Sequence, residues 1–354
     1  MRQNTVPRHI VPTFAPSAIL GALLLSISGV VLAQPVPTPA PAIAEDQTLL
    51  PYAEPGQLVD IGGRHINLLC TGSGGPPVVL MAGLASWSYV WNKTQPEIAK
   101  GTRVCAFDRA AYGFSDPAPR PQILDEVVSD LYAALHKGGL SGPYVLVGHS
   151  SGGIEARVFA QRWPREVAGM VLLDTPGAGQ ALRDMNQPGF PGLGVESEVP
   201  ENLKCALLAA RGPLDPSNRE YENCSRSLPD GAPVALRKVW PRFFTADYAM
   251  AHISLLSSLL THRYDSADHH RLGNMPLVVL SRTPEKRPQN QAAFWRIIDK
   301  EWYAHHTALA RLSSRGVHRV IQHTGHDIQS DQPQTVIDAV DEVLRQLHAR
   351  ELAR

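Results

Sequence analysis

The chain has 354 residues, 44% of them hydrophobic, and its 33 basic and 33 acidic residues leave a formal net charge of zero. This apolar content excludes a disordered chain, and the charge balance gives no reason to expect binding to nucleic acid or to an anionic membrane surface. We therefore expect a globular protein whose ligand is a small molecule.

The first 33 residues have the features of a secretory signal peptide. Arg2 and Arg8 precede an apolar stretch over residues 18–31, and residues 31–33 place small side chains where a signal peptidase cleaves. The stretch is shorter than the ~20 residues that span a bilayer, so cleavage after Ala33 is favoured over a membrane anchor. We expect a periplasmic or secreted protein that has no stable membrane insertion after cleavage.

Residues 34–51 begin with a run of Pro and Ala, which predicts an extended linker. Because position 34 is Gln and not Cys, the new N-terminus has no lipidation signal. The folded domain is expected over residues 52–354 and contains all the cysteines. An even number of cysteines in an exported chain favours disulfides, and three pairings are possible. These cysteines are Cys70, Cys105, Cys205 and Cys224.

Between residues 52 and 174, short apolar runs alternate with helix-like segments, which is typical of a mostly parallel sheet. Gly62 and Gly63 join the first two runs and predict an antiparallel hairpin at the start. One connecting helix begins near Leu124, and Gly138 is expected to end it in a left-handed conformation. The predicted strands are 59–61, 66–69, 78–82, 104–107, 144–147 and 170–173.

From residue 175 to about 274 the alternation stops, and Pro/Gly-rich sequence precedes helical segments such as 243–260. This part predicts an inserted helical cap. The pattern then resumes with strands at 277–280 and 317–322, a helix over 294–312 between them, and a final helix around 336–347. The predicted fold class is thus α/β, with a mostly parallel central sheet flanked by helices.

Ser150 stands in a G-x-S-x-G motif, Gly148-His149-Ser150-Ser151-Gly152, between an apolar strand and a helical run. A serine hydroxyl becomes a useful nucleophile when a sharp turn projects it toward a base, and such a turn needs glycines at its crowded flanks. The helix that follows directs its free N–H groups and positive dipole end at the same place. The alternative is a Gly/Ser turn that only caps a helix. The strand before the motif and the helix after it favour the nucleophile.

Three segments resemble the α/β-hydrolase family in sequence and in order. Residues 148–152 resemble its nucleophile elbow, and residues 108–115 resemble its D-R-x-G-x-G-x-S loop, with Ala111 where the family usually has Gly. Thr324-Gly325-His326-Asp327 resembles the segment that carries the catalytic histidine. The likeness covers about 57–347 apart from the cap, and it implies the α/β-hydrolase fold with a serine, acid and histidine triad.

Among the fourteen histidines, His326 follows a predicted strand and a glycine and precedes the closing helix, so we favour it as the general base over its neighbour His323. The acid is open between Asp174 and Glu285, because each follows a strand that ends at the same edge of the sheet. The family most often places its acid after the later strand, where Glu285 lies, and some members place it after the earlier strand, where Asp174 lies. We favour Asp174, which is short and rigidly held, over Glu285 in a basic loop.

The resemblance also implies the oxyanion hole and the cysteine pairing. The backbone N–H groups of Leu84, beside Gly83, and of Ser151 are the expected donors to the oxyanion. In this fold the second and fourth strands are neighbours, so Cys70 is expected to bond to Cys105. Cys205 would then bond to Cys224 within the cap.

Neither a metal nor another cofactor is expected. His269 and His270 are better explained as a solvated turn, and the adjacent His305 and His306 point in different directions on a helix. A cluster of cap side chains fits either an apolar substrate pocket or the core of the cap, and we favour the core. These side chains are Trp240, Phe243, Phe244, Tyr248 and Met250, and the same question applies to Trp87, Tyr89 and Trp91.

The function that this pattern favours is an exported serine hydrolase that cleaves an ester-type bond in a small molecule. An acyl-enzyme would form on Ser150, with His326 as base. Two other functions stay open: an amidase or iminopeptidase that uses the same site, and a ligand-binding protein on the same scaffold that does not turn over.

Overall fold

The computed structural model describes residues 44–177, 195–215, 217, 219–261, 272–283 and 292–352. The predicted signal peptide and the first part of the predicted linker lie outside these residues. Within them, no helix combines the length and the apolar character that crossing a bilayer requires.

The end of the predicted linker is folded, which corrects its expected boundary at residue 51. A 3-10 helix, η1 (Gln47–Ala53), begins there with Asp46 as its cap, and the Asp46 carboxylate accepts a hydrogen bond from the Thr48 N–H. Leu49 and Tyr52 are buried, and the Asp46 N–H donates to the Gly231 carbonyl. The burial of Leu49 outweighs the flexibility that the Pro/Ala composition suggests, so the fold begins before Tyr52.

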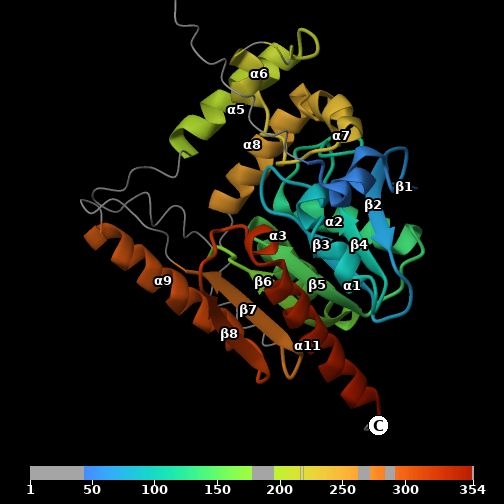
Figure 1. Ribbon diagram of the computed structural model, residues 1–354, viewed down its shortest axis with the longest axis vertical. Coiled ribbons are helices and arrows are strands. Elements are labelled where there is room, and N and C mark those ends of the chain that lie inside the picture. Colours follow the sequence, from blue (N-terminus) through green and yellow to red (C-terminus); the bar gives the residue numbers. More distant parts are fainter. Residues whose placement is uncertain are drawn as a thin grey trace, which may run out of the picture. The chain divides into compact units, whose positions relative to one another are not determined.

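The described residues form one eight-stranded sheet in the order β1-β2-β4-β3-β5-β6-β7-β8 (Figure 1). The first three strands in this order pair antiparallel and all other pairs are parallel, which confirms the predicted fold class. The strands are β1 (Gln57–Asp60), β2 (His65–Thr71), β3 (Val78–Met81), β4 (Val104–Phe107), β5 (Tyr144–His149), β6 (Val167–Leu173), β7 (Leu277–Arg282) and β8 (Gly316–Ile321).

Glycines form the turns at two predicted positions. Gly62 and Gly63 have φ angles of 122° and 84°, and their N–H groups donate to the Asp60 carboxylate, which closes the β1–β2 hairpin. At the end of α2 (Leu124–Lys137) the prediction was wrong by one residue. Gly138 keeps a right-handed φ of −75°, and the left-handed residue is Gly139, with φ 76°, because the helix continues through one further residue before the chain turns.

Helices cover both faces of the sheet. The α2, α3 (Ser151–Arg162) and α9 (Ala292–Ala310) helices contribute to the apolar layer on one face. On the other face lie α1 (Gln95–Ile98), α11 (Pro333–Leu352) and the 3-10 helix η2 (Ser88–Trp91). Two short helices, η3 (Pro164–Glu166) and α10 (Ile328–Asp331), complete this part of the fold. Strands β3, β4 and β5 are buried along their whole length, so the sheet's centre is rigidly packed.

Between β6 and β7, the described residues form helices joined by turns and loops and contain no strand. Their helices are α5 (Val195–Ala209), α6 (Arg219–Cys224), α7 (Val234–Val239), η4 (Trp240–Phe243) and α8 (Ala246–Thr261). Trp240, Phe243 and Phe244 are buried against Trp87, with ring centroids 5.1 to 6.2 Å apart. They therefore form the core that holds this cap to the sheet, whereas Met250 is exposed.

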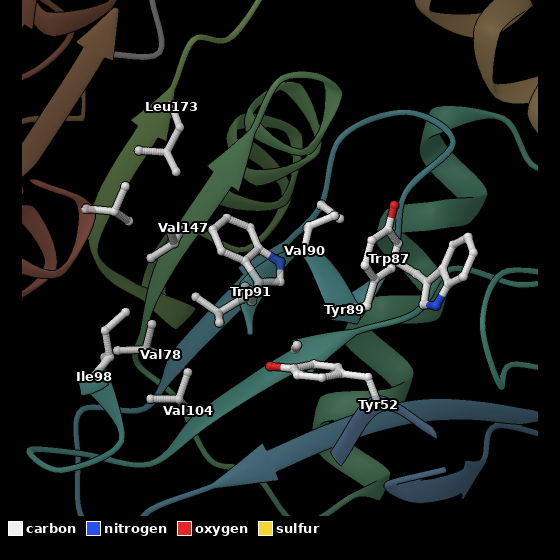
Figure 2. Close-up of a cluster of buried hydrophobic side chains, with 14 of the residues drawn as sticks. Tyr52, Val78, Trp87, Tyr89, Val90, Trp91, Ile98, Val104, Val147 and Leu173 are labelled. Carbon is white, nitrogen blue, oxygen red and sulfur yellow. The ribbon is translucent and has the colours of Figure 1, made fainter. Parts of the chain in front are cut away.

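The aromatic residues after β3 belong to the same core. Figure 2 shows Trp87, Tyr89 and Trp91 in one cluster with Val147 of β5 and Leu173 of β6. These aromatic side chains are buried, so they anchor the segment that follows the expected oxyanion loop.

Both expected disulfides are present. Cys70 of β2 bonds to Cys105 of β4, its direct partner in the sheet register. Cys205 of α5 bonds to Cys224 of α6 and holds these two cap helices together.

Candidate active site

Ser150 occupies a strained turn between β5 and α3. Its φ and ψ angles are 52° and −123°, a region that residues with side chains rarely adopt. A Cβ at Gly148 would collide with the backbone of Gly152, and one at Gly152 would collide with the Met81 and Ala82 carbonyls. The turn therefore needs both glycines, as expected from the motif. The Ser150 N–H donates to the Leu173 carbonyl at 2.9 Å, which ties the turn to β6.

The structure brings His326 to Asp174. The His326 Nδ1 lies 2.6 Å from Asp174 Oδ2, and because an ionised carboxylate only accepts hydrogen bonds, Nδ1 is the donor. Asp174 directly follows β6 and is fully buried, whereas the His326 side chain is 42% exposed. His326 Nε2 is then the nitrogen without a proton in the neutral ring. Glu285, the other candidate acid, lies outside the described residues.

Three further donors hold the Asp174 carboxylate in place. The Arg282 N–H and the Trp302 Nε1–H donate to Oδ1 at 3.1 and 2.7 Å, and the Arg282 guanidinium donates to Oδ2 at 2.6 Å. Burial alone raises the pKa of Asp174, but the His326 hydrogen bond and the Arg282 charge outweigh it and hold that pKa well below its usual range. The carboxyl group is therefore ionised.

The sequence did not predict the roles of Arg282 and Trp302. Arg282 is the last residue of β7, which pairs parallel with β6 and ends at the same edge of the sheet. The position of Arg282 near Asp174 could therefore have been predicted from the strand order. Trp302 lies on α9, 128 residues from Asp174, and no local pattern indicates that contact.

Of the two candidate histidines, His326 contacts Asp174, while His323 is exposed and has a left-handed backbone with φ 57°. His149, inside the motif, has a role that the sequence did not suggest. Its Nε2 lies 3.0 Å from the His326 carbonyl, so the ring supports the loop that carries the base. Burial and the nearby His326 lower the pKa of His149 to about 4. It is thus neutral near pH 7.

The other histidines named in the sequence analysis lie in separate parts of the chain. His306 is buried between the Thr175 carbonyl and the Ser281 hydroxyl, at 2.8 and 2.5 Å. His269 and His270 lie outside the described residues. Among the residues that are described, no three His, Cys, Asp or Glu side chains cluster in a way that would hold a metal ion.

Leu84 and Ser151, which are expected to supply the oxyanion donors, are both near Ser150, because Leu84 lines the same cavity and Ser151 follows Ser150 in the chain. Ser151 is the first residue of α3, so its N–H has no acceptor within the helix. Gly83 packs against the motif so closely that an added Cβ would lie 3.2 Å from Ser150 Cβ and 3.0 Å from the His149 ring. The backbone thereby brings Leu84, the next residue, to the nucleophile.

Ser150 and His326 line one cavity of ≈ 370 Å³, together with Leu84 and cap residues. The cap wall is largely polar and includes Glu198 of α5 and Arg226 after α6. Tyr248 of α8 also lines the cavity and donates through its hydroxyl to the Ala85 carbonyl at 3.2 Å. The cavity therefore suits a small molecule with polar groups.

Comparison with known proteins agrees with the fold. A family model described as the alpha/beta hydrolase fold matches residues 76–194. The esterase of Thermogutta terrifontis has the same fold, with a TM-score of 0.56 and 21% identity, over 83% of this chain and 99% of that one. The chain has the α/β-hydrolase fold. This fold and the match to the family model support a hydrolase.

Curated relatives match only part of the chain. The uncharacterized protein YbdG of Bacillus subtilis is 33% identical over 121 residues, which cover 34% of this chain and 37% of that protein. The lipase LipV of Mycobacterium tuberculosis is 31% identical over 169 residues, which cover 47% of this chain and 56% of the lipase. The match thus spans 37% and 56% of the length of these two relatives.

Proposed function

We propose that this α/β hydrolase is an exported serine hydrolase that cleaves a carboxylic ester-type bond in a small polar molecule. The observation that carries the proposal is the 2.6 Å contact between His326 and the buried Asp174, at the cavity that also contains the strained Ser150. The likeness to the Thermogutta esterase and to the lipase LipV supports the same type of bond.

The reaction proceeds in two halves. His326 Nε2 removes the Ser150 proton while the hydroxyl oxygen adds to the ester carbonyl, and the ionised Asp174 stabilises the imidazolium that forms. The Leu84 and Ser151 N–H groups donate to the resulting oxyanion. His326 then protonates the leaving alcohol, and a water molecule hydrolyses the acyl-enzyme by the same steps.

Export is part of the proposal. The features of residues 1–33 support a cleaved signal peptide, and the two disulfides are of the kind that persists in an oxidising compartment. The mature chain would begin at Gln34 and reside in the periplasm or outside the cell.

The test is hydrolysis of p-nitrophenyl acetate by purified mature protein and by its Ser150→Ala variant. We expect the variant to lose a factor of about 10⁴ or more in kcat and to keep its circular dichroism spectrum. Ser314→Ala, which changes an exposed serine between α9 and β8, serves as the matched control. Esterase activity that survives Ser150→Ala would refute the proposal, and turnover of aminoacyl amides in preference to esters would redirect it to an amidase.

A further inference from the structure

A buried guanidinium lies against residues 82–86, which we call the oxyanion loop because they include Leu84. Arg109 follows β4 and is only 2% exposed in its side chain. Its Nη1 donates to the Gly83 and Ser86 carbonyls at 3.1 and 3.2 Å, and its Nη2 donates to the Ala82 carbonyl. One side chain thus fixes three carbonyl groups of a five-residue loop.

The Gly83 contact bears directly on the expected donor. The Gly83 carbonyl and the Leu84 N–H belong to the same planar trans peptide group, in which C=O and N–H point in opposite directions. Because Arg109 holds the carbonyl toward the protein interior, the Leu84 N–H is turned the other way. A donor bonded to the carbonyl also polarises the peptide group, which makes its N–H a stronger donor.

The same guanidinium is anchored to the helix that supplies the other donor. The Arg109 Nε donates to Glu155 Oε1 at 2.8 Å, and Glu155, on α3 four residues after Ser151, has a fully buried side chain. Burial raises the pKa of Glu155, while the charge and the hydrogen bond of Arg109 oppose this. Arg109 and Glu155 therefore join the oxyanion loop to the first turns of α3.

The loop needs such support because its backbone is strained. Ala85 has a φ angle of 59°, a left-handed conformation that is unfavourable for a residue with a Cβ. The neighbouring Asp108 holds the next part of the chain, since its carboxylate accepts the Ser88 N–H at 2.9 Å. Arg109 thus holds the loop itself, and Asp108 holds the segment that follows it.

We propose that Arg109, held by Glu155, is a positioning residue that sets the direction and the strength of the Leu84 N–H as an oxyanion donor. The inference rests on the proposed function, because it assigns this role in the reaction at Ser150. Arg109 does not touch the substrate. Its effect is therefore expected on turnover and on binding of a tetrahedral adduct, and not on binding of the planar ester.

The experiment compares Arg109→Lys with Arg64→Lys. Arg64 is also largely buried and pairs with Asp130, but it lies in the β1–β2 hairpin away from the cavity, which makes it a matched control. Lysine keeps the charge but loses the planar set of donors that reaches several carbonyls at once. The measurements are kcat and KM for p-nitrophenyl acetate, and Ki for phenylboronic acid, which adds to a serine hydroxyl and places a tetrahedral oxygen in the hole.

For Arg109→Lys we expect kcat to fall about 10- to 100-fold, KM to change less than about twofold, and the boronate Ki to rise by a factor similar to the fall in kcat. The control should keep all three values. A folded Arg109→Lys enzyme with unchanged kcat and Ki would overturn the proposal. So would a fall in kcat without a rise in Ki, because it would indicate a general structural effect.

Glu155→Gln provides a second variant, which keeps an oxygen acceptor for the Arg109 Nε but removes the charge. We expect the same pattern with a smaller change, and loss of the fold in both variants would assign the pair to stability and overturn the proposal. A crystal structure of Arg109→Lys gives a readout besides activity, since the Gly83–Leu84 peptide group should rotate. If esterase activity does not depend on Ser150, the proposed function fails, while this rotation still tests the effect of Arg109 on the loop.

Discussion

Replacing Asp174 by Asn tests the proposed triad at a carboxylate that accepts four hydrogen bonds. Each carboxylate oxygen of Asp174 accepts from two donors: Oδ2 from the His326 Nδ1 and the Arg282 guanidinium, and Oδ1 from the Arg282 N–H and the Trp302 Nε1–H. An Asn side chain has one oxygen and one NH₂ group. Whichever way the amide is turned, its NH₂ faces two donors.

The substitution is expected to lower both kcat and the free energy of unfolding. If the NH₂ group faces His326, Nδ1 must lose its proton, so Nε2 carries the proton and cannot act as base, which costs about 10⁴ in kcat in such triads. The substitution also leaves the Arg282 charge, 17% exposed, without its partner. Removing one partner of a buried ion pair costs roughly 3–5 kcal/mol of folding stability, and we expect the lower part of that range because Arg282 is partly exposed.

The assays are p-nitrophenyl acetate turnover and urea unfolding of the mature Asp174→Asn protein, with Glu285→Gln as the parallel variant. We expect Glu285→Gln to change kcat less than about tenfold. A folded Asp174→Asn enzyme whose kcat lies within tenfold of the wild type would refute the reasoning. If Glu285→Gln instead lost about 10⁴, Glu285 would be the acid.

Two further predictions concern stability. Burial lowers the pKa of His306 from 6.5 to about 4. Between these pH values the ring is neutral in the folded protein but protonated in the unfolded chain, so unfolding takes up a proton. The contribution of His306 to the free energy of unfolding is therefore complete above pH 6.5 and falls by about 3 kcal/mol as the pH drops toward 4. Urea unfolding of His306→Phe should show lower stability at pH 7.5 but a flatter decline toward pH 4, and an unchanged decline would contradict this. Ala111 has a φ angle of 65°, so Ala111→Gly should raise the free energy of unfolding by about 0.5–1 kcal/mol, and a lower melting temperature would show that the strain is compensated.

Local sequence was sufficient wherever the relevant forces act between near neighbours. The strand, the glycine-flanked serine and the helix at residues 144–162 were predictable because backbone crowding at Ser150 restricts the residues beside it. The same holds for the Gly62–Gly63 hairpin. Where two adjacent residues could serve, as at Gly138 and Gly139, the pattern did not decide which one takes the left-handed conformation.

The residues that contact the site from distant segments of the chain were harder to predict from the sequence. Asp174 and Glu285 both follow strands that end at the same edge, so the sequence alone left the acid open. The Asp108-Arg109 pair was recognised as part of a family-like loop, but its bonds to the oxyanion loop and to Glu155 depend on where β3, β4 and α3 end in space.

By itself, the sequence determined the α/β sheet, the nucleophile turn and the approximate place of the base, because these depend on hydrophobic periodicity and on backbone sterics over a few residues. The tertiary structure decided that His326 bonds to Asp174, that Arg282 and Trp302 hold that carboxylate, and that the cap aromatics form a core and leave a polar wall at the cavity. The contact between His326 and Asp174, for example, joins residues that are 152 apart in the sequence. Packing alone sets the distances of such contacts, and no local pattern encodes them.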